Sequence, residues 1–444
     1  MTGNALAEND TVNHTSTVVR WYVLVMMVLV YTLSITDRYM ISTVLEPIRL
    51  EFHKTDSEIA DLTGLAMGLF YVTLGFPLSW LIDRSSRRNV IVGSMVVWSA
   101  MTVSCAVARN YTQLLIARVG VGVGEAGGTP GANSIISDYF PASRRPMALT
   151  IFSLGAPIGA WIALTVAGGI ADAHGWRASF TYLGVPGLIV GAIIFITIRE
   201  PRRGQLDAAD AIAKPASFFE AMRFLLTQRS ALHLMIGSAL TALWGWGLAW
   251  WTPTFLTRNY GLSTGAAADV TGDIHLWGGS IATLATGWLM TRPSMADPRN
   301  IVRLMGGVIG VCTLVSFGIF YTHSLAVAHA LFWIFIPSIY FYIGPCFGIL
   351  LNLARPGMRA QFCAATLFLA NIGNLVVAPK AVGMLSDWFA PNGISDGPSL
   401  RLAMLCLVPT GLWATFHYFW SARGTIMIED QERATGIRIA TTQA

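Results

Sequence analysis

Twelve long apolar stretches follow one another along this chain, separated by short polar breaks. The stretches are Trp21–Val44, Ile59–Ile82, Asn89–Ala108, Tyr111–Ser137, Pro146–Ala171, Ala178–Ile198, Ala231–Leu256, Ala266–Met290, Ile301–Tyr321, Ser324–Leu353, Met358–Leu385 and Ser399–Phe419. Each is about as long as the roughly 20 apolar residues that a membrane-spanning helix needs. Strands are excluded because lipid does not tolerate open sheet edges, and a β-barrel would show shorter, alternating segments. The sequence therefore predicts an all-α membrane protein with twelve transmembrane helices.

The composition excludes a soluble protein. Charged residues make up 12% of the 444 residues and hydrophobic residues 54%, whereas soluble domains are roughly one quarter charged. The net charge of +5 is small and spread along the chain, so it does not suggest nucleic acid as a partner. All five cysteines fall within apolar stretches, which favours neither a disulfide framework nor a thiol metal site. We expect no metal and no cofactor.

A polar linker divides the chain into two halves of similar length. We expect a disordered cytoplasmic tail over residues 1–19, a six-helix bundle over 20–198, a cytoplasmic linker over 199–229, a second six-helix bundle over 230–421 and a cytoplasmic tail over 422–444. Two pseudo-symmetric six-helix bundles joined by a long central loop are typical of a secondary transporter.

The distribution of Lys and Arg predicts the orientation. If the N-terminus is inside, the inside segments carry 20 Lys and Arg residues and the outside loops carry 6. Cytoplasmic loops are the ones enriched in these residues. We therefore expect a monomeric multi-pass protein of the cytoplasmic (inner) membrane with both termini in the cytoplasm.

The loop after the second stretch carries a recognisable motif. It reads Ser79-Trp-Leu81-Ile-Asp83-Arg84-Ser-Ser86-Arg87-Arg88. This loop resembles the Major Facilitator Superfamily signature, in which glycines stand where Ser79 and Ser86 stand here. Its charges Asp83, Arg84, Arg87 and Arg88 lie at a membrane edge, which favours a structural or gating motif over contact with substrate.

Further motifs lie in the first, fourth and fifth stretches. They are Thr36-Asp37-Arg38-Tyr39, then Ala117-Arg118 through Gly124-Glu125-Ala126, then Ser153-Leu-Gly155-Ala-Pro157-Ile-Gly159. Together they resemble the Spinster-like branch of the superfamily, which includes lysolipid and sphingolipid exporters. The anion–cation symporter branch shares some of these features and is the second choice. The Spinster-like resemblance implies that Asp37, Arg38, Arg118 and Glu125 take part in proton coupling and state switching.

The same four residues stand out on physical grounds, because a charge inside the membrane costs several kcal/mol unless it is paired or faces water. Arg118 and Glu125 are seven residues apart and share one helix face with Gly122 between them. Asp37 and Arg38 are adjacent and point about 100° apart, so they do not pair with each other. We predict that Asp37 and Glu125 carry the proton and that Arg38 and Arg118 supply the substrate or coupling charge. The alternative is a structural ion-pair network within the first bundle.

Polar and aromatic residues elsewhere could face a substrate. We expect a cavity lined by Tyr71, Trp244, His275, Tyr340 and Asn371. Trp250 and Trp251 are expected in the interfacial aromatic belt, and Lys380 is expected to extend to the membrane surface.

The sequence contains no Gly-rich phosphate loop, and its eight His residues form no metal-binding pair. It therefore predicts neither a built-in ATP-driven motor nor an enzyme. We expect a proton-coupled secondary transporter that moves a small amphiphilic or organic-anion solute, such as a lysolipid or sphingolipid, by alternating access in the lipid bilayer. The alternative is a proton symporter that takes up a carboxylate such as an aromatic or sugar acid. Remote alternatives are a membrane-embedded enzyme and a transport-dead receptor.

Overall fold

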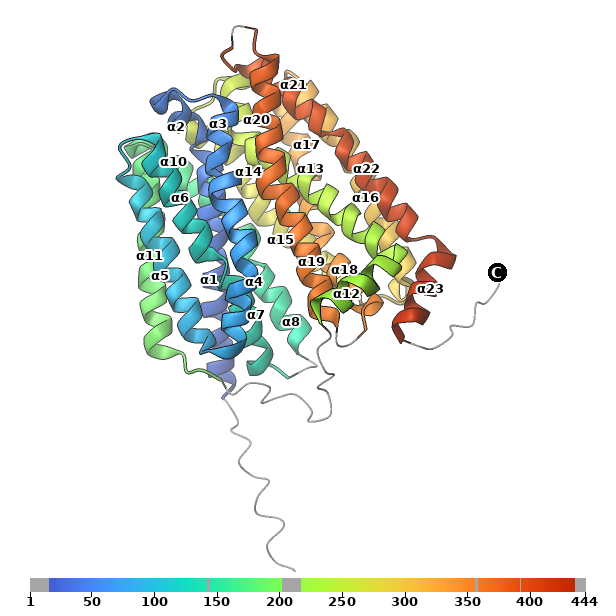
Figure 1. Ribbon diagram of the computed structural model, residues 1–444. Coiled ribbons are helices and arrows are strands. Elements are labelled where there is room, and N and C mark those ends of the chain that lie inside the picture. The colour runs from blue at the N-terminus through green and yellow to red at the C-terminus, as the bar shows by residue number, and fades with distance from the viewer. Residues whose placement is uncertain (1–15, 142–143, 202–216, 356–357, 392, 436–444) are drawn as a thin grey trace, which may run out of the picture.

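The computed structural model describes residues 16–141, 144–201, 217–355, 358–391 and 393–435. Within these ranges every regular element is helical, and the helices form two bundles that stand side by side (Figure 1). The first described residues and the last helix, α23 (Gly424–Thr435), both lie at the lower side in Figure 1. We call this the terminal side and the opposite one the distal side.

The first bundle contains six helical columns. They are α1 (Thr17–Thr43); α3 (Asp56–Ile59), η1 (Ala60–Leu62), η2 (Gly64–Leu69) and α4 (Phe70–Arg84); α5 (Arg87–Ala106); α6 (Tyr111–Glu125) and α7 (Gly128–Tyr139); α8 (Arg145–Ser153), α9 (Gly155–Trp161), η3 (Ile162–Val166) and α10 (Ala167–His174); and α11 (Trp176–Thr197). A short helix that the sequence analysis does not predict, α2 (Leu45–Phe52), follows α1 on the distal side.

The second bundle repeats this plan. Its columns are α13 (Arg229–Tyr260); α14 (Thr264–Asp273), η4 (Ile274–Gly279) and α15 (Ser280–Leu289); α16 (Pro298–Tyr321), preceded by the short η5 (Pro293–Met295); α17 (Leu325–Phe341) and α18 (Ile343–Leu353); α19 (Arg359–Asn371), η7 (Ile372–Val377) and α20 (Ala378–Phe389); and α21 (Gly397–Leu407) and α22 (Pro409–Ser421).

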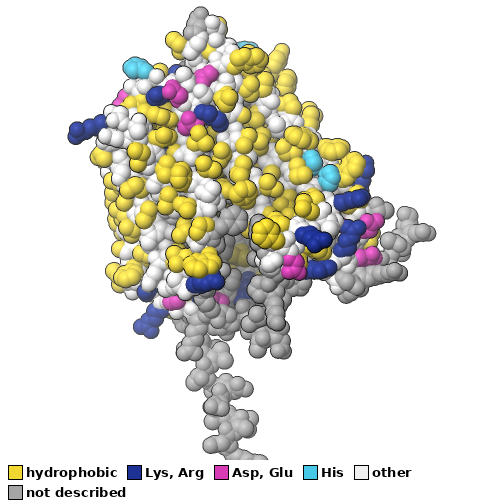
Figure 2. All heavy atoms as spheres, viewed as in Figure 1, with side chains coloured by type: hydrophobic (Ala, Val, Ile, Leu, Met, Phe, Trp, Pro, Cys, Tyr) yellow, Lys and Arg dark blue, Asp and Glu magenta, His cyan; other side chains and the backbone are white. Residues whose placement is uncertain are grey.

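Nine helices in the described part of the chain are long and apolar enough to cross a membrane. The second, fourth and eighth predicted columns fall outside this group, although each is helical along its length. The second and fourth carry buried charge or closely packed glycine, as expected of helices that face a partner helix rather than lipid. Apolar side chains are spread over the middle of the flank seen in Figure 2, and charged side chains lie mainly near its two ends.

Local sequence explains where several helices begin. Ser86, Asn110 and Ser263 each place a side-chain oxygen on a backbone N–H of the following first turn, which caps α5, α6 and α14. Thr55 and Glu58 form a reciprocal capping box at α3. These caps sit in short loops, so each column turns back sharply beside the one before it.

Four columns contain a π-helical turn, in which one extra residue is accommodated. The turns are η2, η3, η4 and η7, in the second, fifth, eighth and eleventh columns. These columns meet across the two bundles: a Cβ at Gly68 would lie 2.8 Å from Leu375 Cβ, and one at Gly272 would lie 2.2 Å from Thr165 Oγ1. The π-helical turns therefore lie at the contact between the bundles.

Two helices lie where the sequence analysis expects a linker and a tail. In the linker, α12 (Phe218–Thr227) is amphipathic and buries Ala221 and Leu225. Beyond the second bundle, α23 is fastened by Asp430, which accepts hydrogen bonds from Ser230 N (2.6 Å) and Ser230 Oγ (2.7 Å). Residues 1–15 of the predicted N-terminal tail lie outside the described residues.

Candidate functional site

Two ion pairs join α1 to α6 inside the first bundle. The four charged side chains come from adjacent positions on α1, Asp37 and Arg38, and from Arg118 and Glu125 on α6. We call these four residues the charge tetrad. Because Asp37 and Arg38 point in different directions from α1, each pairs with a different residue of α6. The tetrad carries no net formal charge when all four groups are ionised.

Arg118 forms an ion pair with Asp37, and this pair lies nearer the distal side than the other one. Its NH1 lies 3.2 Å from Asp37 Oδ2, and Asp37 Oδ1 accepts a second hydrogen bond from Thr102 Oγ1 of α5 (2.6 Å). The Arg118 guanidinium also contacts Leu62 O (3.5 Å) and Met67 Sδ (3.1 Å). Arg118 is fully buried and thus ties together three columns of the first bundle.

The second pair is simpler and lies closer to the bundle interface. Arg38 Nε donates to Glu125 Oε2 at 2.6 Å, and Ser34 Oγ donates to the same oxygen at 3.2 Å. Tyr71 of α4 places its ring 4.1 Å below the Arg38 guanidinium. The other Glu125 oxygen, Oε1, is buried and has no hydrogen-bond partner among the described residues. One oxygen of this buried carboxylate is therefore free to take a proton.

Glycine brings α6 close to its neighbours. A Cβ at Gly122 would lie 2.5 Å from Met67 O, and one at Gly124 would lie 2.5 Å from Trp98 N. Only a residue without a side chain permits such approaches of backbone to backbone. Gly122 thereby sets the distance between the tetrad and the second column.

A cavity opens between the bundles on the terminal side of the contact between η2 and η7. It encloses about 510 Å³, its open mouth included. Its walls come from α4, from the junction of α6 and α7, and from α19, and consist of Tyr71, Val72, Gly75, Ala126, Pro130, Ala364, Leu367, Phe368 and Asn371. Tyr71 and Asn371 are thus two of the predicted lining residues that the structure places there. Since Tyr71 also touches Arg38, the cavity lies one side chain away from the Arg38–Glu125 pair.

An aromatic cluster fills the bundle interface next to Arg38. Tyr39 of α1 stacks on Trp250 (ring centroids 4.8 Å apart) and meets Trp246 and His275 edge-on. His275 Nδ1 lies 2.8 Å from Tyr340 OH. His275 and Tyr340 are 2% and 4% exposed, so they pack between the bundles and do not line the cavity as predicted.

Three predictions about tryptophan are corrected by the burial of α13. Trp244 does not line the cavity: it is fully buried inside the second bundle, where its Nε1 donates to Ser316 Oγ (3.1 Å). Trp250 and Trp251 are also buried, and their indole N–H groups donate to Asn374 Oδ1 (2.9 Å) and Pro379 O (3.2 Å). They do not form an interfacial belt, because α13 lies at the centre of the second bundle.

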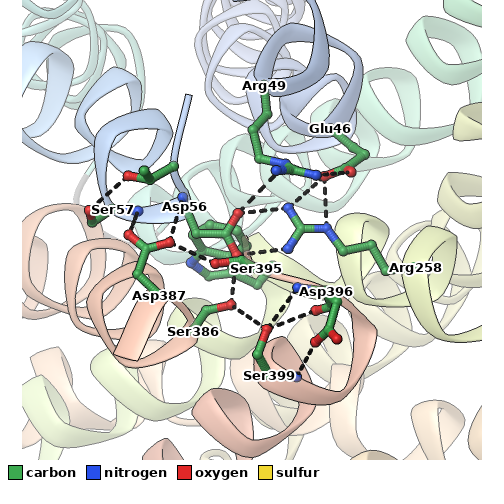
Figure 3. Close-up of polar contacts among 12 residues, drawn as sticks. Glu46, Arg49, Asp56, Ser57, Arg258, Ser386, Asp387, Ser395, Asp396 and Ser399 are labelled. Atoms are coloured by element: carbon green, nitrogen blue, oxygen red, sulfur yellow. Dashed lines mark hydrogen bonds and ion pairs between the residues drawn. The ribbon is translucent and has the colours of Figure 1, made fainter. Parts of the chain in front are cut away.

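On the distal side, a polar network joins the two bundles (Figure 3). Arg258 of α13 reaches across to Glu46 Oε2 (2.6 Å) and to both oxygens of Asp56 (2.7 Å each) in the first bundle. Asp387 of α20 accepts from Asp56 N and Ser57 N (2.9 Å each), which caps α3 from the opposite bundle. We call the set Glu46, Asp56, Arg258 and Asp387 the distal latch.

A second bridge corrects the prediction for Lys380. Its Nζ lies 2.8 Å from Asp61 Oδ1 and 2.8 Å from Ser57 O, so it contacts the first bundle and does not extend to the membrane surface. The sequence analysis missed the distal latch because its charges lie in short loops and helix ends, where charges are ordinarily solvated. Although burial opposes it, hydrogen bonds from Arg49 and the charge of Arg258 lower the pKa of Glu46 below its ordinary value.

Comparison with known proteins identifies the family. The family model described as Major Facilitator Superfamily matches residues 27–393. The chain belongs to the Major Facilitator Superfamily. Members of this superfamily are transporters, so the prediction of a membrane transporter rather than an enzyme is confirmed, as is the twelve-helix, two-bundle fold.

Relatives that match over most of their length indicate which branch of the superfamily the chain resembles. The chain is 28% identical over 393 residues to an MFS-type efflux pump of Mycolicibacterium smegmatis, covering 87% of this chain and 89% of that protein. It is 26% identical over 435 residues to a sphingosine-1-phosphate transporter of Danio rerio, covering 90% and 83%. A crystal structure of a bacterial homologue of the human lysosomal transporter Spinster, inward-facing and unoccupied, superimposes with a TM-score of 0.81 at 28% identity, covering 94% of this chain and 99% of the other. The predicted Spinster-like resemblance is confirmed.

The signature loop of the superfamily, residues 79–88, lies on the terminal side, where its arginines contact other parts of the first bundle. Arg87 is buried, binds Glu200 (Nε to Oε1, 2.8 Å) and pairs with Asp138 of α7. Arg88 N donates to Glu200 Oε2 (2.8 Å), and Arg84 stacks on Trp80 at 4.3 Å. These contacts join elements of the first bundle to each other. The side chain of Asp83 lies outside the described residues.

Proposed function

We propose that this chain is a proton-coupled secondary transporter for a small amphiphilic or organic anion, acting as a monomer by alternating access. The observation that carries the proposal is the Arg38–Glu125 pair beside the cavity. Arg38 supplies a cation within one side chain of the cavity wall, and Glu125 keeps a buried oxygen without a partner among the described residues.

The pair offers a physical mechanism for coupling. Arg38 stabilises the ionised form of Glu125, and a buried carboxylate that loses its cation takes up a proton to avoid an unpaired charge. An anionic substrate that engages Arg38 from the cavity would compete with Glu125 for the guanidinium. Substrate binding and protonation of Glu125 would then favour each other, as coupled transport requires.

The cavity and the latch support alternating access. The distal latch joins the bundles on one side, while the cavity opens between them toward the other. We propose that both termini are cytoplasmic and that the membrane is the cytoplasmic membrane, on the strength of the 20-to-6 distribution of Lys and Arg. The structure is then a state open to the cytoplasm.

The lining suggests the substrate class. Most of the cavity wall is apolar, with Tyr71 and Asn371 as polar groups and Arg38 behind Tyr71. An apolar wall beside one cation suits an amphiphile with an anionic head, such as a lysolipid or a sphingoid phosphate. The similarity to a sphingosine-1-phosphate transporter points in the same direction. An aromatic carboxylate is the second candidate, because it also combines an apolar body with one negative charge.

The test is proton movement driven by substrate. Purified protein in liposomes loaded with a pH dye is exposed to lysolipids, sphingoid phosphates and aromatic or sugar acids, beside the Glu125→Gln variant. We expect one ligand class to move protons in wild type and not in Glu125→Gln. Glu51→Gln is the matched control, since Glu51 also binds an arginine, Arg177, but does not line the cavity. Transport of a ligand without protons, equal in all three proteins, would overturn the proposal.

A further inference from the structure

A pair of histidines joins the start of α13 to the end of α22, away from the cavity; we call the surface around His233 and His417 the histidine surface. His233 Nδ1 and His417 Nδ1 are 2.9 Å apart. Around them lie Trp420, stacked on His233 at 5.5 Å, and Phe416, edge-on to His417 at 5.5 Å. Neither the charge tetrad nor the distal latch uses these rings.

The hydrogen bond between the two rings determines which of their Nε2 atoms carries a hydrogen. In a neutral pair one ring donates from Nδ1 and has a bare Nε2, while the accepting ring carries its hydrogen on Nε2. Neither Nε2 is used in a contact among the described residues. The pair therefore offers one N–H donor and one nitrogen acceptor, on the outer sides of the two rings.

A cation stands beside the pair. The Arg423 guanidinium lies 3.7 Å above the Trp420 ring and makes no hydrogen bond or ion pair within the described part of the chain. Arg229 is exposed and lies one helical turn from His233 on the same face of α13. Asp430 lies on α23, which packs against the start of α13, but it binds Ser230 and Arg433.

The depth of the site matches the edge of a bilayer. His233 is the fifth residue of α13, and His417 lies four residues before the end of α22. Both are thus roughly 6 Å from the terminal-side helix ends, within the ~5–10 Å zone where headgroups meet acyl chains. Exposed apolar side chains continue from the histidine surface toward the membrane centre, with Trp413 57% and Phe416 51% exposed. Figure 2 shows His side chains beside Lys and Arg side chains on this flank, over α22.

We infer that the histidine surface binds an anionic glycerophospholipid of the surrounding membrane, with phosphatidylglycerol as the best fit. Arg423 and the Nε2–H of one histidine hold the phosphate. The bare Nε2 of the other accepts a hydrogen bond from a hydroxyl of the headgroup, and an acyl chain lies along Trp413 and Phe416. Phosphatidylcholine has no headgroup donor for the bare nitrogen, and its trimethylammonium group offsets the negative charge that its phosphate offers to Arg423.

The experiment is lipid binding to the full chain in detergent, measured by native mass spectrometry. Phosphatidylglycerol and phosphatidylcholine with identical acyl chains are titrated against wild type, Arg423→Gln and the double variant His233→Asn/His417→Asn. We expect wild type to prefer phosphatidylglycerol about tenfold, since one hydrogen bond to a charged group is worth this much. Both variants should reduce the preference to about twofold or less.

The matched control is Arg292→Gln. Arg292 also stacks on a tryptophan, Trp288, at 3.8 Å, but has no histidine pair beside it. It should leave the preference unchanged. Arg423→Gln removes an exposed side chain and keeps the test valid if the histidine variant fails to fold. A preference that persists in Arg423→Gln, or is absent in wild type, would overturn the inference. So would displacement of the lipid by millimolar inorganic phosphate, which would indicate a site for free phosphate.

Discussion

Arg118 is a fully buried cation whose ion-pair partner, Asp37, is 5% exposed. Removing one partner of such a pair leaves an uncompensated charge in a medium of low dielectric constant. We therefore expect Arg118→Leu to lower the free energy of unfolding by about 3–5 kcal/mol, measured by denaturant unfolding in detergent.

The double variant Asp37→Asn/Arg118→Leu tests the cause. It removes both charges, and we expect it to recover most of the loss, since a buried pair can often be replaced by neutral groups at little cost. If the double variant is as unstable as Arg118→Leu, the loss comes from the contacts of Arg118 with Leu62 and Met67 rather than from Asp37.

Gly122 gives a second prediction at this scale. A methyl group there would lie 2.5 Å from the backbone oxygen of Met67, and a backbone atom cannot rotate away. Gly122→Ala should therefore destabilise the protein by about 1–3 kcal/mol through overpacking. Gly93→Ala on α5 is the control: nothing lies within 4 Å of its Cβ, so it should stabilise by up to about 1 kcal/mol through helix propensity. Thermal unfolding of both variants checks the opposite signs.

The sequence singles out these residues but not their partners. Asp37, Arg38, Arg118 and Glu125 stand out because charges are rare in apolar stretches. Which arginine meets which carboxylate depends on the rotation of α1 against α6, and no local pattern encodes that rotation. Trp250 is the opposite case. An aromatic residue near a helix end is expected in the interfacial belt, but the packing of α13 buries Trp250 inside the protein.

At the scale of elements, the four π-helical turns all lie in columns that face the other bundle, although α1 and α13 face it without one. A π-helical turn shifts the register of the helix, so the residues on its two sides present different stripes to the partner. On the distal side of η2 and η7, Asp56 and Ser57 meet Asp387 in the latch. On the terminal side, Tyr71 and Asn371 face the cavity instead.

The latch predicts how the distal side opens. Arg258→Gln removes the ion pairs to Glu46 and Asp56 and leaves two carboxylates with less compensation. We expect the population with an open distal side to rise about tenfold or more, measured by electron paramagnetic resonance distances between labels on α2 and α21. Arg401→Gln is the matched control, because Arg401 binds the carbonyls of Phe320 and Thr322 within the second bundle. Equal distances in wild type and Arg258→Gln would contradict the role of the latch.

The latch also has a defined response to pH. Arg49 and Arg258 lower the pKa of Glu46 below its ordinary 4.5. A carboxylate with a lowered pKa supports the closed state fully above its ordinary pKa and loses that contribution as the pH falls through the lowered value. The same label distances should therefore be constant between pH 7.5 and pH 5.5 and lengthen only below about pH 4.5. Opening at pH 6 would show that another group controls the distal side.

At the scale of the whole molecule, the bundles touch on the distal side and diverge toward the terminal side. The twelve columns and their caps are predictable because hydrophobic length and capping chemistry are local. The relative arrangement of the two bundles is not predictable from the sequence, because alternate packings of the same helices differ by only a few kcal/mol in free energy. Transport by rocking requires the distal contact to break in every cycle.

A reversible crosslink tests this requirement. A Cβ at Gly64 of η2 would lie 3.6 Å from Val376 Cα of η7, so Gly64→Cys/Val376→Cys places two thiols across the bundles within reach of a disulfide. In a Cys406→Ser background, which removes the exposed native thiol, we expect oxidation to stop transport and reduction to restore it. Undiminished transport by the oxidised, crosslinked protein would rule out opening at this contact.

The charge tetrad also decides how the transporter responds to voltage. With two arginines and two carboxylates ionised, its movement carries no net charge through the membrane field. One proton on Glu125 changes that to a single elementary charge, on which a potential of 100 mV across the full membrane does about 2.3 kcal/mol of work. A bound anion with one negative charge offsets the proton on Glu125, so the loaded step and the empty return would both be electrically silent. The proton gradient, and not the resting potential, would then set the direction of the cycle.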